Sequence, residues 1–198
     1  MKFLQNKLVW IGVALVLLML TTRSNLISHF GTSLFLPDAS YAVFFLGGLF
    51  LGRVRGALAM LAVLIFEAAL VDFYAINFNG ISAYCVTSAY GFLVFAYAAL
   101  WFVGRWYAPR HDFSVKGLSG LLAAAVAAGS AAFVIANVSF YLLAGYFGSM
   151  GVADYVAGVA QYFGSYVAVT VLYVAVTVCG QMFFAQLKHK LQHEKNVA

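Results

Sequence analysis

A single cysteine stands in the middle of a polar stretch that separates two long apolar segments. The stretch NGISAYCVTSAY runs from Asn79 to Tyr90, and its small, hydroxyl-rich residues surround Cys85. A thiol in such a setting can act as a nucleophile, form an adduct or bind a soft metal. The other cysteine, Cys179, lies near the opposite end of a later apolar segment, so the two thiols are not expected to meet at disulfide distance.

Two kinds of chemistry remain open for Cys85. Nucleophilic catalysis needs a nearby base, and His29 is the one histidine expected on the same side of the membrane, so a membrane thiol enzyme using Cys85 and His29 is one hypothesis. A protein-built metal site is not expected, because three or four ligands are not available around the cysteine. A metal that arrives already chelated needs only one protein ligand.

Two acids precede the polar stretch on one predicted helix. Glu67 is expected near mid-membrane, and Asp72 lies five residues later, roughly 140° around the helix, so the two do not form an acid/base pair. Asp72 leads into a polar loop that contains Asn77, Asn79 and Ser82, which predicts a place at a cavity mouth. For Glu67 a protonated or hydrogen-bonded contact between helices is the favoured interpretation.

A stripe of tyrosines marks the last apolar segment. The spacings of 7, 4 and 7 residues add up to five helical turns and place the side chains on one face; these are Tyr155, Tyr162, Tyr166 and Tyr173. Packing is the favoured explanation. A large, flat, amphipathic ligand would also find a suitable wall there, and Tyr41, Phe44 and Phe45 are expected near the same side.

The elements that position these residues must lie in a membrane. Of the 198 residues, 65% are hydrophobic and 9% charged, and the mean hydropathy is +0.96. A soluble domain of this size could not cover so much apolar surface. The alternation typical of a membrane β-barrel is absent, and no Walker, dinucleotide-binding, HExxH or CxxC motif occurs. The sequence therefore predicts an all-α integral membrane bundle without its own ATPase or zinc site.

Six transmembrane helices are expected in a single domain that spans residues 1–198, with a tail at about 188–198. The expected helices are Lys7–Thr22, Ala39–Gly52, Gly56–Ile76, Val86–Trp106, Leu118–Tyr146 and Tyr155–Leu187, the last with a break near its start. The first is expected to be retained, because no A-x-A-like cleavage site follows it.

The distribution of basic residues predicts the orientation. With both termini in the cytoplasm, ten of the eleven Lys and Arg residues fall on the inner side. The exception is Arg23, whereas Asp38, Asp72 and Asp154 lie at outer ends. The formal charge of +5 is then explained by contact with an anionic inner leaflet of the lipid bilayer, and no nucleic-acid partner is expected.

Small residues recur every four positions on two segments. They are Gly48, Gly52 and Gly56 on one, and Gly120, Ala124, Ala128, Ala132 and Ala136 on the other. Such ladders let helix backbones approach closely. Packing within the chain is the favoured interpretation, and a docking face for another membrane subunit, as in a non-catalytic assembly protein, is the alternative.

Three stretches together resemble one family. PDASYAVFFLGG from Pro37, the acid Asp72, and CVTSAY running into LWFVGRWYA at Leu100 are similar to the BtuM family of bacterial vitamin B12 (cobalamin) transporters. That family is related to the S-components of energy-coupling-factor (ECF) transporters. The similarity runs from about Pro37 to Ala108, and six helices and the chain length agree over the rest.

The resemblance implies a corrinoid in an outward-open cavity, with Cys85 in an axial position on cobalt and with Asp72 and Tyr90 at the site. A soft thiolate suits cobalt, whose corrin ring leaves two axial positions free. Many relatives have proline where this chain has Ser88 and Phe95. This difference concerns the start of the following helix and therefore the direction in which the Cys85 side chain points. The further residues expected to line the site are Asn77, Asn79, Ser82, Tyr84, Ser88 and Tyr162.

The expected function is cobalamin binding and uptake across the bacterial inner membrane. Transport would proceed alone or with an ATP-driven coupling module of two ATPases and a transmembrane coupling subunit. The cysteine would also assist removal of an upper ligand such as cyanide, with the cofactor supplying most of the reactivity. An S-component for another vitamin is the alternative among transporters.

Overall fold

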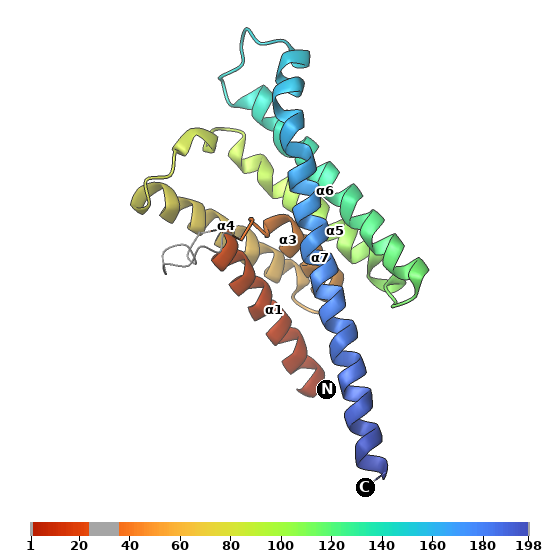
Figure 1. Ribbon diagram of the computed structural model, residues 1–198. Coiled ribbons are helices and arrows are strands. Elements are labelled where there is room, and N and C mark those ends of the chain that lie inside the picture. The colour runs from red at the N-terminus through yellow and green to blue at the C-terminus, as the bar shows by residue number, and fades with distance from the viewer. Residues whose placement is uncertain (1, 24–35, 198) are drawn as a thin grey trace.

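The chain folds into a bundle of helices, seen in a computed structural model that describes residues 2–23 and 36–197 (Figure 1). The α-helices are α1 (Lys2–Arg23), α3 (Ser40–Leu51), α4 (Ala57–Phe78), α5 (Leu93–Tyr107), α6 (Val115–Leu143) and α7 (Val152–Val197). Short 3-10 turns are η1 (Ala83–Cys85), η2 (Tyr90–Phe92) and η3 (Ala108–Arg110). These described residues contain no strand, so the all-α prediction is confirmed for them.

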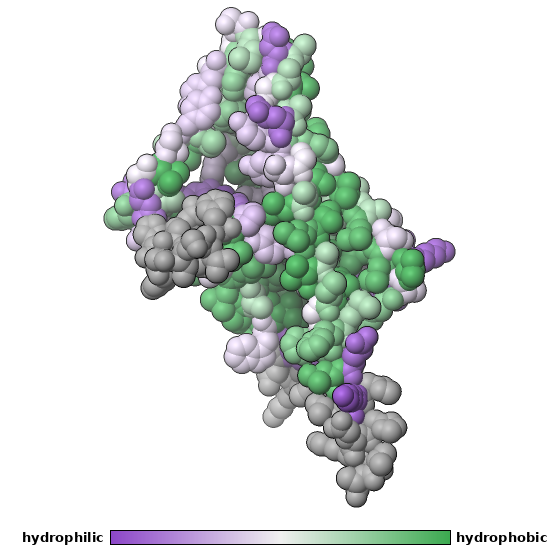
Figure 2. All heavy atoms as spheres, in the orientation of Figure 1, coloured by the Kyte–Doolittle hydropathy of each residue, from purple (hydrophilic) through white to green (hydrophobic). Residues whose placement is uncertain are grey.

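Four helical stretches are long and apolar enough to cross a membrane. They are Ala57–Phe78, Tyr90–Arg110, Val115–Leu143 and Val152–Leu187. Large apolar side chains point outward from them, such as Phe66 and Phe73 on α4, which are 64% and 61% exposed. Figure 2 shows hydrophobic residues covering much of the middle of one face. The protein therefore has the build of a helical membrane protein.

The first two expected spans, which correspond to α1 and α3, are not among these four stretches. With 12 residues, α3 is about 18 Å long, shorter than the ~30 Å hydrocarbon core of a bilayer. Ten of its twelve residues are buried, because α1, α4, α5, α6 and α7 all pack against it. The α3 helix forms the centre of the bundle. Length and hydropathy support four of the six expected spans among the described residues.

Glycines bring α3 and α5 into backbone contact. A Cβ on Gly48 would clash with the backbone of Trp101, and a Cβ on Gly104 would clash with the carbonyl oxygen of Phe45. Next to this contact, Phe44 stacks on Tyr97 with ring centroids 4.1 Å apart. The glycine ladder therefore packs within the chain at Gly48, as the favoured interpretation predicts.

The second ladder also faces its own chain. Gly120 lies beside the Tyr107 ring, whose hydroxyl donates to the Gly117 carbonyl oxygen at 2.6 Å. Ala124, Ala128 and Ala132 are buried, since α6 packs between α5 and α7. In contrast, Gly56 has a positive φ of 84° just before α4, and a Cβ added there would meet no atom within 4 Å, so it belongs to a turn.

The helix after the polar stretch starts later than predicted. The expected start at Val86 is wrong, because α5 begins at Leu93 after η1 and η2. Hydroxyl side chains accept backbone N–H groups that a helix would otherwise use: Ser82 accepts from Tyr84 at 3.2 Å and Thr87 from Ala89 at 3.2 Å. These local bonds stabilise turns in place of a helix.

The last helix is longer than predicted and has no break near its start. Its 46 residues extend for about 69 Å, and the expected tail at 188–198 continues the helix as far as Val197. Figure 1 places the N-terminal end of α1 and the C-terminal end of α7 toward the same end of the molecule. The α6–α7 connection and the C-terminal end of α4 lie toward the other end.

Candidate functional site

A cavity of about 650 Å³ opens at the end of the bundle away from the termini. This volume falls within the range of small-molecule sites, roughly 300–1,000 Å³. Its walls come from every α-helix named above and from the turns η1 and η2. Figure 2 shows the molecule hollowed between the α4 side and the α6–α7 end, with hydrophilic residues visible inside.

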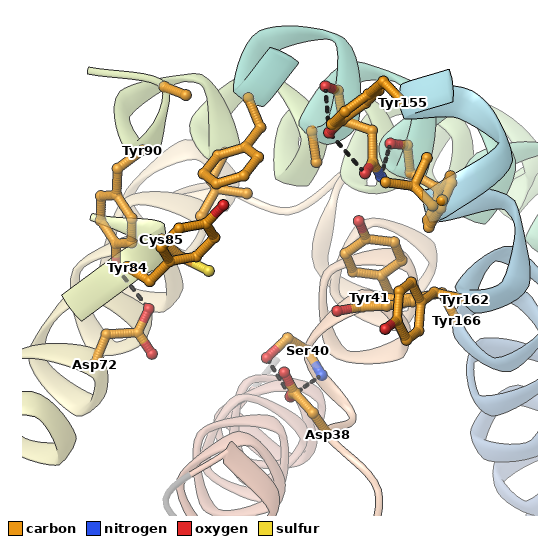
Figure 3. Close-up of a pocket in the computed structure, with 18 of the residues that line it drawn as sticks. Asp38, Ser40, Tyr41, Asp72, Tyr84, Cys85, Tyr90, Tyr155, Tyr162 and Tyr166 are labelled. Carbon is orange, nitrogen blue, oxygen red and sulfur yellow. Dashed lines mark hydrogen bonds between the residues drawn. The ribbon is translucent and has the colours of Figure 1, made fainter. Parts of the chain in front are cut away.

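Cys85 occupies one wall of this cavity. It ends η1 and is exposed, and Figure 3 shows its sulfur directed into the space between the Tyr84 side and the side that carries Tyr41, Tyr162 and Tyr166. A ligand in the cavity can therefore reach the sulfur from the side of the aromatic wall.

Five of the nine residues expected at the site line the cavity together. They are Asp72, Tyr84, Cys85, Tyr90 and Tyr162. They come from α4, η1, η2 and α7, so the fold joins residues that are up to 90 positions apart in sequence.

The other four expected residues lie outside the lining. Asn77 donates its side-chain N–H to the Phe73 carbonyl oxygen at 2.8 Å, and Ser82 caps η1. Asn79 ends α4, and Ser88 is exposed between η1 and η2. Of these four side chains, Ser82 stabilises the turn that carries Cys85 and Asn77 bonds within α4.

Arg23, the one basic residue expected on the outer side, forms the polar floor of the cavity. Arg23 donates from Nε to Asp72 Oδ1 at 2.8 Å and from Nη2 to Asp72 Oδ2 at 2.6 Å. The Tyr90 hydroxyl donates to the same carboxylate at 2.7 Å. The Asp72 carboxylate oxygens therefore accept three hydrogen bonds. Asp72 lines the cavity and also orients Arg23 and Tyr90.

The remaining nitrogen of Arg23 connects two more helices, α3 and α5, to the floor. Nη1 donates to Ser40 Oγ at 2.9 Å and to the Tyr97 hydroxyl at 3.1 Å, and lies 3.5 Å from Asp38 Oδ2. The Arg23 side chain is only 12% exposed. A planar guanidinium suits such a forked arrangement, so Arg23 fixes the relative positions of α1, α3, α4 and α5.

One short sequence motif could have been used to predict this cluster. Asp38 Oδ1 accepts from the Ser40 backbone N–H at 2.9 Å and from its hydroxyl at 2.6 Å, which is an Asx turn at the start of α3. The Asp-x-Ser motif after a proline, together with a lone arginine opposite several outer acids, could have indicated an ion-pair cluster.

Aromatic side chains form the wall opposite Cys85. The Tyr41 and Tyr166 rings lie 5.5 Å apart, and Tyr166 also contacts Phe133 at 5.7 Å. The last residue of the tyrosine stripe does not join them, because the Tyr173 hydroxyl donates to the Pro37 carbonyl oxygen at 2.8 Å. Phe44 and Phe45 are fully buried in the core, so the predicted wall is formed by only part of the expected set.

A pair of stacked tyrosines closes the rim. The rings of Tyr84 and Tyr146 lie 4.6 Å apart at an angle of 8°, and the Tyr146 hydroxyl donates to the Tyr84 carbonyl oxygen at 3.3 Å. Tyr84 also meets Phe140 at 5.7 Å. Because Tyr84 directly precedes Cys85, this pair joins the cysteine turn to the α6–α7 connection.

Cys85 supplies the one thiol among the described residues that line the cavity, and the thioether of Met150 also lines it. No three His, Cys, Asp or Glu side chains within residues 2–23 and 36–197 are grouped so as to hold a metal ion. His29, the candidate base for a thiol enzyme, lies outside the described residues. Comparison with protein-family models and with curated proteins gave no match for this chain.

Proposed function

We propose that this membrane protein binds a cobalt corrinoid, cobalamin, in the cavity, with the Cys85 sulfur as an axial ligand of the metal. The observation that carries the proposal is a single thiol that faces an aromatic cavity, while the described residues contain no group of three His, Cys, Asp or Glu side chains that could hold a bare metal ion. Such a site suits a metal that brings its other ligands with it. A corrin supplies four nitrogens and leaves the axial positions for one protein atom.

The cavity walls support a flat ligand with polar edges. Tyrosine combines an apolar ring with a hydrogen-bonding tip, and Tyr41, Tyr162 and Tyr166 present both to the space in front of the thiol. A corrinoid is larger than a drug-sized molecule, so its ring would enter while its side groups extend through the open mouth. The resemblance around Cys85 and Asp72 agrees with this arrangement.

Ligand exchange at cobalt would follow from the same geometry. The Cys85 sulfur forms a bond to Co(III) as the bond to cyanide breaks, and the thiol proton leaves with cyanide as hydrogen cyanide. The metal keeps its oxidation state, so no reductant is needed. A soft thiolate is a suitable donor for this exchange, and the protein would then act on the vitamin as well as carry it.

Uptake across the bacterial inner membrane is the transport part of the proposal. The cavity would face outward, with both termini in the cytoplasm, and an ATP-driven coupling module would act in trans where energy is required. The charge distribution supports this orientation. The common location of both chain ends, opposite the cavity, agrees with it.

Absorption spectroscopy tests binding directly. Purified protein in detergent is incubated with cyanocobalamin, separated from free vitamin, and its spectrum recorded. We expect a red protein whose bands differ from those of the free vitamin, and we expect Cys85→Ala to lose that difference. The matched control is Cys179→Ala, which removes the other thiol, a residue of α7 that does not line the cavity.

The outcomes separate the proposal from its alternatives. Protein that stays colourless after loading contradicts cobalamin binding and leaves an S-component for another vitamin. Vitamin that binds equally to wild type and Cys85→Ala contradicts the axial thiolate. Loss of Cys85 reactivity in His29→Ala, without any corrinoid, would favour a thiol enzyme.

A further inference from the structure

Glu67 is a half-buried acid that does not line the cavity. Both of its carboxyl oxygens are buried and have no hydrogen-bond partner among the described residues. It lies in the middle of α4, one of the stretches that can cross a membrane. An unpaired carboxylate in such surroundings is strongly disfavoured, so the neutral acid is the form that this conformation accommodates.

The spacing along α4 directs Glu67 toward α1. Met60 lies on the α1 side of the helix, since its methyl group would be 3.5 Å from a Cβ on Gly12. Glu67 follows Met60 by seven residues, close to two full turns, and therefore shares its face. The helix on this side, α1, ends with Arg23.

Arg23 lies on the same side of α4 as Glu67. The contact between Gly12 and Met60 and the contact between Arg23 and Asp72 place α1 alongside α4 in the same direction, and Glu67 lies between these two contacts along α4. The groups around Arg23 itself are Asp38 before α3, Asp72 on α4 and Tyr97 on α5. Two carboxylates thus surround one arginine, and an ionised Glu67 would be a third.

The two acids of α4 compete for Arg23. Five residues separate Glu67 from Asp72, which corresponds to about 7.5 Å along the helix and roughly 140° around it. The guanidinium holds Asp72 through two nitrogens in this conformation. It cannot keep that forked contact and also reach Glu67, so the pairings exclude each other.

We propose that Glu67 is a proton-binding site whose deprotonation transfers Arg23 from Asp72 to Glu67. The Glu67 carboxylic acid releases its proton to solvent, Arg23 stays protonated throughout, and Asp72 keeps the hydrogen bond from Tyr90. Loss of the forked contact loosens the cavity floor, because Arg23 also holds Ser40 and Tyr97. The ligand is a proton, so this inference goes beyond the proposed function.

Infrared spectroscopy of the ligand-free protein detects the proton. The chain has six acidic residues, so the comparison with Glu67→Gln is needed to assign a band to Glu67. We expect wild type to show a carboxylic-acid C=O band at pH 7 that is absent from Glu67→Gln and is lost as the pH rises. No corrinoid is present, so the result is independent of the proposed function.

Two variants test the transfer of Arg23. Asp72→Asn removes the competing carboxylate, and we expect the Glu67 band to disappear at a pH at least one unit lower than in wild type. Arg23→Gln removes the alternative partner, and the band should then persist to a higher pH. The control Ser40→Ala removes one uncharged contact of Arg23 and should move the midpoint far less.

Either of two results would overturn the inference. One is a wild-type spectrum at pH 7 that is identical to that of Glu67→Gln in the carboxylic-acid region. The other is a Glu67 midpoint that is the same in wild type and Arg23→Gln. If Asp72→Asn fails to fold, the comparison of these two proteins still decides the transfer step.

Discussion

Arg23 and Asp72 meet through two parallel hydrogen bonds of 2.8 and 2.6 Å, although 49 residues separate them in the chain. The contact joins the end of α1 to α4 at the floor of the cavity. A forked pair of this kind is more specific in geometry than a single ion pair. The position of α1 relative to the cavity therefore depends on one side chain.

Removal of Arg23 should destabilise the bundle. In Arg23→Gln the Asp72 carboxylate keeps only the Tyr90 hydroxyl, and breaking one partner of a partly buried pair costs about 3 kcal/mol. Thermal unfolding in detergent, followed by circular dichroism, should show a lower midpoint. The control is Arg55→Gln, which removes an exposed arginine and should change the midpoint little.

The double variant Arg23→Gln/Asp72→Asn checks the cause of that loss. It removes both charges of the forked pair, so it should be destabilised by less than the sum of the two single changes. A double variant whose loss equals that sum would argue against direct coupling of the pair.

The two cysteines should differ in accessibility from outside the cell. Cys85 lies at the open cavity, whereas Cys179 lies in a membrane-crossing stretch of α7. A membrane-impermeant maleimide added to intact cells should label Cys179→Ala protein and leave Cys85→Ala protein unlabelled, as measured by mass spectrometry. The opposite pattern would contradict an outward-facing cavity.

A methyl group at Gly48 should weaken the contact between α3 and α5. In Gly48→Ala the new Cβ meets backbone atoms of Trp101, which cannot move aside as a side chain could, and overpacking costs about 1–3 kcal/mol. Thermal unfolding should show the loss. The matched control is Gly164→Ala on α7, where no atom lies within 4 Å and alanine favours the helix.

The ring of Tyr146 should hold the turn that carries Cys85. Tyr146→Ala removes the stack on Tyr84, which is worth about 0.5–1.5 kcal/mol, so amide hydrogen exchange over residues 81–90 should become up to about tenfold faster. Tyr146→Phe keeps the ring and loses only the hydrogen bond at 3.3 Å. Equal exchange in both variants would assign the effect to the hydroxyl.

Periodicity and composition predicted what depends on local pattern. The all-helical membrane bundle follows from long apolar runs, and close packing at Gly48 follows from the four-residue ladder. Cys85 and Tyr84 reach the cavity because the polar stretch between two apolar segments must lie at an end of the bundle. These features need no knowledge of which helices are neighbours.

The floor of the cavity could not be predicted in this way. Arg23 contacts residues from three other elements, and such contacts depend on tertiary packing. The expected roles of Asn77 and Ser82 were based on polarity alone, whereas their side chains bond to nearby backbone. The late start of α5 has the same origin, since hydroxyl groups compete for the N–H groups of a helix.

The contacts of Gly48 with Trp101 and of Gly104 with Phe45 have a mechanical consequence. Two helices whose backbones touch at both places have no layer of side chains on which to slide, so α3 and α5 move as one rigid body. Any widening of the cavity must then come from displacement of α1, α4, α6 or α7, or of the turns η1 and η2, relative to this rigid pair.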